Sequence, residues 1–144
     1  MSTKKSKFVE TVLKSWDDIF NSKIGSFFIG KDRKATRYIT GDERSIALLT
    51  HVLTLIIWFL PPLLIYILKK HESDYIESHA KTSFNFQITL LFIYIAGALI
   101  GLTPIGFSVL IGTFVANFLL VAVGTVKAAE GIYYDYPFTI RFLK

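Results

Sequence analysis

The most constraining feature of the sequence is an unbroken stretch of 45 residues, 82–126, that contains no Asp, Glu, Lys, Arg or His. A single helix needs about 20 apolar residues to cross a hydrocarbon core roughly 30 Å thick. The stretch therefore predicts two membrane-spanning helices, at residues 83–102 and 105–126, with a tight turn at Thr103-Pro104 between them.

The composition favours an all-α integral membrane protein. Hydrophobic residues make up 52% of the 144-residue chain, which contains 13 Phe and 7 Tyr. A soluble domain of this length has too small an interior to bury so much apolar surface. The chain contains no Cys, which excludes disulfides, thiolate catalysis and zinc–thiolate sites.

A third apolar segment, residues 45–68, contains only His51 and Tyr66 as titratable side chains. Pro61 and Pro62 interrupt it, and because proline lacks an amide hydrogen the helix must kink or break there. Two arrangements remain open: a kinked single crossing, favoured by the length, and a re-entrant hairpin that turns back at the prolines. The second is favoured by the charges, because it places every charged segment on one side of the membrane.

The first 44 residues are predicted to form an amphipathic helix followed by a polar linker. They contain ten Lys or Arg and six Asp or Glu, and their apolar residues recur at steps of three and four up to Gly25 or Gly30. Such a helix lies in the membrane interface with its Lys residues toward anionic headgroups, or it packs on the protein's own loops. Residues 31–44 are expected to be the linker, with a turn at Gly41-Asp42.

The remaining charged segments flank the two predicted spans. In the connector at residues 69–81, Ser73 is placed to cap a helix that runs into the second span, and Glu77 and Lys81 are spaced to pair across one turn. Gly131 is expected to end the last helix. The chain thus divides into residues 1–44 and a membrane domain at residues 45–144 with a polar, aromatic tail.

Three separate motifs resemble one known family. They are His51 with Pro61-Pro62-Leu63, the sequence YIESHAK at residues 75–81 continuing into NFQI at 85–88, and Lys127-Ala128-Ala129 with Gly131 and YPFTIR at 136–141. Together they resemble a group of small bacterial membrane proteins of unknown function, distantly related to the "Tic twenty" component of the chloroplast import machinery. The resemblance covers residues 45–144 and implies a helical membrane domain, with a role in a protein-conducting complex suggested by the plastid relative.

Polar side chains within membrane spans are costly and are therefore candidates for function. They form a polar seam along a conduction path, or they make hydrogen bonds between helices and to headgroups. Gly97 and Gly101 form a GxxxG spacing that suits close helix packing, self-association or partner binding. The polar candidates are His51, Asn85, Gln87 and Asn117, with His79 at the entry to the second span.

The tail carries a further group of candidates, Tyr136, Pro137 and Arg141. Its aromatic residues suit an interfacial belt. Arg141 is expected to bind a lipid phosphate or a helix C-terminus, or to make the tail a docking surface by pairing with a partner's acid or with Glu77.

The sequence shows no phosphate-binding glycine loop and no nucleophile elbow, and HESDY at residues 71–75 is not the HExxH zinc helix. We therefore expect no enzyme, cofactor, metal or nucleic-acid partner. The leading interpretation is a multi-pass protein of the bacterial plasma membrane with its N-terminus in the cytoplasm. It would serve as a subunit or scaffold of a membrane complex connected with protein translocation or the envelope, in contact with anionic lipid and with copies of itself or other membrane proteins. The alternative is a small homo-oligomeric channel or transporter with Asn117 and the Gly97/Gly101 face near its path.

Overall fold

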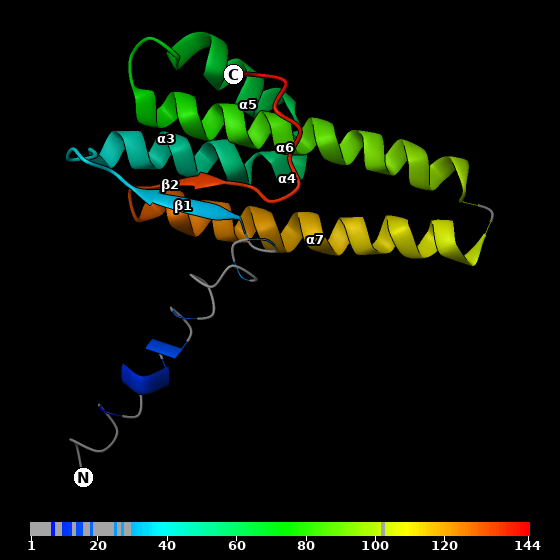
Figure 1. Cartoon of the computed structure of the whole chain (residues 1–144). Helices are drawn as coiled ribbons and strands as arrows, with labels where there is room; N and C mark the ends of the chain where they lie inside the picture. The colour runs from blue at the N-terminus through cyan, green and yellow to red at the C-terminus, as the bar shows by residue number, and fades with distance from the viewer. Residues whose placement is uncertain are drawn as a thin grey trace.

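The computed structural model describes residues 7, 10–12, 14, 15, 18, 25, 27, 30–101 and 103–144. The predicted amphipathic helix falls largely outside these residues. The described elements follow one another along the chain as two strands and five helices (Figure 1): β1 (Lys31–Lys34), α3 (Gly41–Val52), α4 (Thr54–Ile57), α5 (Leu60–Lys69), α6 (Asp74–Leu99), α7 (Pro104–Ala129) and β2 (Ile132–Asp135).

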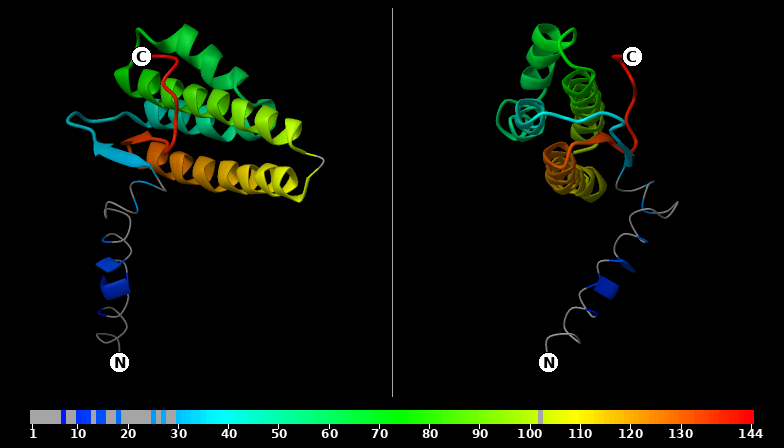
Figure 2. Two further views of the ribbon diagram at one scale, coloured as in Figure 1. Left: turned by 45° about the vertical axis from the view of Figure 1, so that its right-hand side comes forward. Right: turned by 90° about the vertical axis from the view of Figure 1, so that its left-hand side faces the viewer.

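Helices α6 and α7 form a long antiparallel hairpin whose turn extends well beyond the other helices (Figures 1 and 2). Ser73 caps α6 by accepting a hydrogen bond from the Ile76 amide, and Thr103 caps α7 with Pro104 in its first turn. Gly131, with φ of 78°, ends α7 as the sequence predicts. Each helix has 26 residues and is about 39 Å long at 1.5 Å per residue, enough to cross a bilayer.

The outer surface of α7 is strongly apolar. Only 11% of its most hydrophobic 18-residue window is buried inside the protein. The exposed side chains include Ile105, Phe107, Phe114, Phe118 and Leu119. A contiguous surface of this kind is too costly to hold in water and is the expected surface of a lipid-facing helix. The chain thus has two helices that are long and apolar enough to span a bilayer.

The first apolar segment folds back on itself instead of crossing in one piece. The reversal occurs at Trp58, whose φ of 62° and ψ of −122° end α4. Pro61 and Pro62 lie just after it, in the first turn of α5, where a missing amide hydrogen costs nothing because that amide has no helical partner. The break is therefore three residues earlier than the prolines predict. The single kinked crossing is not observed, and the segment is a hairpin in which α3 packs on α6 and α7, and α5 packs on α6.

The fold is mostly helical, as the sequence predicts, but residues 31–34 of the predicted polar linker form a strand. Strand β1 pairs with β2 in antiparallel register, Lys31 opposite Asp135 and Lys34 opposite Ile132. Gly30 precedes the pair with φ of 102°, and a Cβ there would lie 2.3 Å from the Asp135 carbonyl oxygen, so only glycine fits. Gly41 does not form a linker turn; it begins α3.

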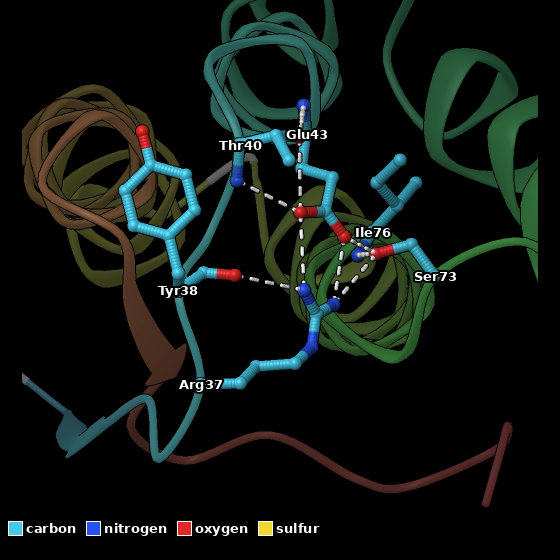
Figure 3. A network of polar contacts seen from close by, with 6 residues as sticks. All are labelled: Arg37, Tyr38, Thr40, Glu43, Ser73 and Ile76. Carbon is cyan, nitrogen blue, oxygen red and sulfur yellow. Dashed lines mark hydrogen bonds and ion pairs between the residues drawn. The ribbon is translucent and has the colours of Figure 1, made fainter.

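Charged segments that lie far apart in the sequence meet at one end of the hairpin, which we call the polar cap (residues 31–44, 69–81 and 127–144). Arg37 donates two hydrogen bonds to the Glu43 carboxylate, at 2.7 and 3.1 Å, and the Ser73 hydroxyl also donates to it (Figure 3). Lys127 pairs with Asp32 at 3.2 Å. These contacts join the first turns of α3 and α6 and place both on the side of the molecule where α7 ends.

The apolar core lies next to the polar cap and not at the hairpin turn. One cluster of buried residues contains Phe86, Leu90, Val121, Tyr134 and Tyr136, and a second contains Ile39, Ala47, Tyr75 and Ala128. Helix α3 packs against both α6 and α7 at this end. The far half of the hairpin has no such cover, and its apolar side chains face outward.

Candidate functional site

Two histidines predicted from separate motifs meet in the core beside the polar cap. His51 on α3 and His79 on α6 are fully buried, and the distance from His51 Nε2 to His79 Nδ1 is 2.8 Å. Tyr136 places its hydroxyl 2.8 Å from His51 Nδ1. The other nitrogen of His79, Nε2, lies 3.1 Å from the Ile132 carbonyl oxygen. The four groups form one continuous hydrogen-bonded chain.

The donor and acceptor of each hydrogen bond in this series follow from its last group, the Ile132 carbonyl. Full burial disfavours a charged ring, so each histidine carries one ring hydrogen. A carbonyl oxygen only accepts, so the hydrogen of His79 is on Nε2 and its Nδ1 accepts. His51 must then donate from Nε2 and accept at Nδ1, which leaves the Tyr136 hydroxyl as the first donor. Burial raises the pKa of Tyr136 well above its ordinary value, which keeps that hydrogen in place. Each neutral histidine therefore has one defined tautomer.

Packing around this hydrogen-bonded network is equally specific. The ring of Tyr136 stacks on Phe86, with centroids 4.0 Å apart and planes 3° apart. Gly124 on α7 leaves room for the network, because a Cβ there would lie 2.7 Å from the Tyr136 oxygen and 3.1 Å from His51 Nδ1. Tyr75 donates to the Ala128 carbonyl at 2.8 Å. The network thus holds α3, α6, α7 and the tail in one arrangement.

The chemistry available to this network is limited by its own bonding. All four ring nitrogens of His51 and His79 are engaged, so neither ring presents a free lone pair to a ligand. Within the part of the chain that the structure describes, no group of three or more His, Cys, Asp or Glu side chains is arranged to hold a metal ion. The network fits a positioning role, in which it fixes the tail against the helices.

The polar residues of the predicted spans serve as contacts between segments. Asn85 binds the tail through its Oδ1, which accepts from the Phe142 and Leu143 amides at 3.0 and 2.8 Å, and its Nδ2, which donates to the Leu143 carbonyl at 2.9 Å. Gln87 donates to Asn117 Oδ1 at 3.1 Å, joining α6 to α7. These positions correspond to the hydrogen-bonding interpretation of the polar residues.

The other predicted site residues lie apart from the histidine network. Gly97 faces α7, where a Cβ would meet Leu110 at 2.9 Å, whereas the atoms nearest to Gly101 belong to the end of its own helix. Glu77 pairs with Lys81 at 2.6 Å, as the spacing predicts. Arg141 is 74% exposed and lies 3.9 Å from Asp135, not beside Glu77. Pro137 lines a groove together with its neighbours in the tail.

Two residues that pack against the network were not predicted from the sequence, Tyr75 and Gly124. Tyr75 is in the YIESHAK motif, but a Tyr at the head of a charged connector is ordinarily an interfacial residue. Gly124 had no visible partner, since its neighbours His51 and Tyr136 are distant in sequence. One feature of the sequence does indicate the role of Tyr75: His79 follows it by one helical turn, so the two side chains share a helix face.

A family model matches residues 42–143, which is more than half of the chain. The chain belongs to the magnetosome magnetite crystal formation protein family (MamF/MmsF). Comparison with curated proteins and with solved structures gives no significant match. The MamF/MmsF match spans α3 to the tail and therefore includes both histidines, Asn85 and Tyr136. Strand β1 lies outside it.

The resemblance to the Tic twenty-like group is wrong, because the matched family is MamF/MmsF. The quoted motifs fall inside the matched range, and the structure gives them a physical reason. His79, Asn85 and Tyr136 are spaced by the contacts that bind the tail to α6. Such spacing reports how a helical hairpin packs and carries no information about protein translocation, so the inference drawn from the plastid relative is withdrawn.

Proposed function

We propose that this MamF/MmsF-family chain is a non-enzymatic subunit of the membrane that encloses a forming magnetite crystal, and that it acts on crystal formation through its polar cap. The observation that carries the proposal is the one-sided distribution of charge. All 16 Lys and Arg residues lie outside the apolar stretches at residues 45–68 and 82–126. The cap gathers residues 31–44, 69–81 and 127–144 at one end of the hairpin.

The opposite end of the hairpin has no charged side chain that could bind a mineral surface or dissolved iron. The turn between α6 and α7, residues 100–103, has no titratable side chain. Oxygen ligands from carboxylates are what hard metal cations require. We therefore assign contact with dissolved ions or with a soluble partner protein to the cap.

The cap is expected to face the cytoplasm, because loops rich in Lys and Arg are retained on that side. The chain would then influence the crystal from outside the enclosed space, by organising the membrane or by assembling partners there. Self-association or binding to other membrane proteins is part of this proposal. The paired and buried histidine network supports it, since the network builds a rigid tail surface on the cap.

Cysteine labelling tests the topology directly, because the chain has no native Cys to remove. Single Cys residues at Lys34, Glu72 and Lys144 sample three parts of the cap, and Ile105→Cys samples the hairpin turn, where the side chain is 71% exposed. With membrane-impermeant reagents, the three cap sites should label from the cytoplasmic side and Ile105→Cys should not. Labelling of Lys34→Cys and Glu72→Cys from opposite sides would exclude the re-entrant first segment.

The role in crystal formation is tested in a magnetite-forming cell that lacks this gene. Crystal size and number are measured after complementation with the wild-type chain, a cap variant (Arg37→Gln with Arg141→Gln) and a turn variant (Ile105→Ala). We expect the turn variant to restore normal crystals and the cap variant to fail at equal membrane abundance. The reverse result would mean that the turn, not the cap, meets the crystal-forming machinery.

A further inference from the structure

A wide groove of about 950 Å³ opens on the polar cap between the strand pair, the first turns of α6 and the tail. Five of its lining residues are basic, and they come from all three of these parts. They are Lys31 and Arg33 on β1, Lys81 on α6, and Arg141 and Lys144 in the tail. These residues are far apart in the sequence, so the fold itself concentrates the charge.

The groove carries a net positive charge even after its internal ion pairs are counted. Asp135 is the one acidic residue in the described lining. It lies 3.9 Å from Arg141, while Lys81 pairs with Glu77 outside the groove. Within the described chain, Lys31, Arg33 and Lys144 take part in no ion pair. Such a set of ammonium and guanidinium groups suits an anion, above all a phosphate, which Arg binds in bidentate fashion.

The position of the groove along α6 places it at the membrane surface. Ser78, Lys81, Thr82 and Asn85 line it from successive turns of one helix face. Lys81 is the last charged residue before the 45-residue uncharged stretch. The groove therefore straddles the level at which water gives way to hydrocarbon, which is the level of lipid headgroups.

An apolar pocket of about 260 Å³ continues from the groove toward the hydrocarbon, between the middle turns of α6 and α7. Leu90, Ile93 and Leu120 line it, and at Gly112 an added Cβ would meet nothing within 4 Å. Pro137 and Phe138 line both spaces. Phe138 lies where the groove and the pocket meet. Its φ is 53°, a conformation that non-glycine residues rarely adopt.

We propose that the basic groove and the apolar pocket form one binding site for an anionic glycerophospholipid. Its phosphate lies among Lys31, Arg33 and Arg141, and one acyl chain enters the pocket beside Gly112. The site rests on the membrane placement given above and not on the role in crystal formation. Strand β1 lies outside the matched family range, so the family match does not cover this half of the headgroup site.

The test is native mass spectrometry of the full chain in a nonionic detergent, titrated with phosphatidylglycerol, with phosphatidylcholine of the same chains, or with inorganic phosphate. We expect a stoichiometric adduct with phosphatidylglycerol at concentrations where the other two give none. Each Lys or Arg near an anionic headgroup contributes about a fivefold gain in affinity. Lys31→Gln with Arg33→Gln should therefore weaken the adduct about 25-fold.

Lys34→Gln with Lys70→Gln is the matched control, since it removes the same charge from the cap outside the groove. It should leave the affinity unchanged. Gly112→Phe should fill the apolar pocket and abolish the lipid adduct, whereas Gly112→Ala should retain it. The four Lys and Arg residues replaced in the charge variants are on the surface, so their replacement should not prevent folding. The charge variants therefore test the site even if Gly112→Phe does not fold.

Four results would overturn the proposal. Equal binding of phosphatidylcholine would mean that the headgroup charge is not recognised. Displacement of the lipid by inorganic phosphate, with Gly112→Phe still competent, would make the groove a free phosphate site. An equal loss of lipid affinity in the two double variants would mean that the lipid is attracted by the general surface charge of the cap. The absence of any lipid adduct would mean that there is no such site. None of these results alters the cysteine-labelling pattern, so the two proposals fail separately.

Discussion

Replacement of Asn85 by Leu should release the tail from α6 without unfolding the helices. Asn85 is 3% exposed and makes three hydrogen bonds to the backbone of Phe142 and Leu143, at 2.8, 2.9 and 3.0 Å. At a net contribution of about 1 kcal/mol each, the three bonds hold the tail by about 3 kcal/mol. Leu has a similar size and lies well in an apolar helix, so the loss should be local.

Hydrogen exchange measures this local opening directly. When opening is fast and reversible, the amides of Phe142 and Leu143 should exchange about a hundredfold faster in Asn85→Leu, the equivalent of about 3 kcal/mol. Amides in the middle of α6 and α7 should keep their protection. The Ile140 amide, which donates to the Thr89 hydroxyl at 3.0 Å, should accelerate less because this second contact remains.

Two further variants identify the cause. Asn85→Asp keeps the acceptor for both amides and loses the donor to the Leu143 carbonyl, so its exchange rates should lie between those of the wild type and Asn85→Leu. Thr89→Val should accelerate exchange at Ile140 alone, by about fivefold. Unchanged exchange at Phe142 and Leu143 in a folded Asn85→Leu protein would refute the reasoning.

Three other changes have defined outcomes. Gly124→Ala should destabilise the protein by about 2 kcal/mol, because the new Cβ would lie 2.7 Å from the Tyr136 oxygen. Gly112→Ala has open space around it and should cause no loss of stability. Thermal unfolding in detergent compares the two variants, and equal losses would contradict the packing argument. Arg37 holds the pKa of the Glu43 carboxyl well below its usual range, so the stability that Glu43 contributes is present above the pKa of the unfolded state, about 4.5, and is lost as pH falls below it. The unfolding temperature of the wild type should therefore fall between about pH 6 and about pH 3 more steeply than that of Glu43→Gln; parallel curves would show that this carboxylate is not responsible.

The long hairpin and its ends could be predicted from the sequence because each depends on local chemistry. An uncharged stretch of 45 residues has few alternatives in a membrane. The hydrogen bond from the Ile76 amide to Ser73, and the ion pair between Glu77 and Lys81, both join residues within one helical turn. Gly131 ends α7 through its own conformational freedom. All of these interactions can be recognised from neighbouring residues alone.

The strand pair and the reversal at Trp58 depend on contacts that the sequence does not reveal. Residues 31–34 are KDRK and exposed, so they lack the alternation of polar and apolar residues that identifies a strand. Their partner strand is about 100 residues away. Trp58 adopts a positive φ that nothing in an apolar run indicates, whereas the adjacent prolines are compatible with a helix start as well as with a break.

The candidate site was predicted residue by residue but not as a unit. His51, His79 and Tyr136 are each noticeable, yet they are separated by 28 and 57 positions along the chain, and only tertiary packing brings them into one network. The tautomers of the two rings cannot be predicted from sequence spacing either, because they depend on the hydrogen bond to the Ile132 carbonyl.

The re-entrant first segment and the histidine network depend on each other, and this coupling explains why the charges end on one side. His51 reaches His79 and Tyr136 only if α3 lies beside the first half of α6, with both helices starting at the polar cap. A straight crossing through residues 45–68 would carry Lys69 and Lys70 to the far side of the membrane, away from their present place beside the start of α6. The buried, hydrogen-bonded network of His51, His79 and Tyr136 therefore forms only in the folded-back arrangement. Because that form brings β1, α6 and the tail together, it also creates the basic groove, so the topology and the proposed lipid site follow from the same packing.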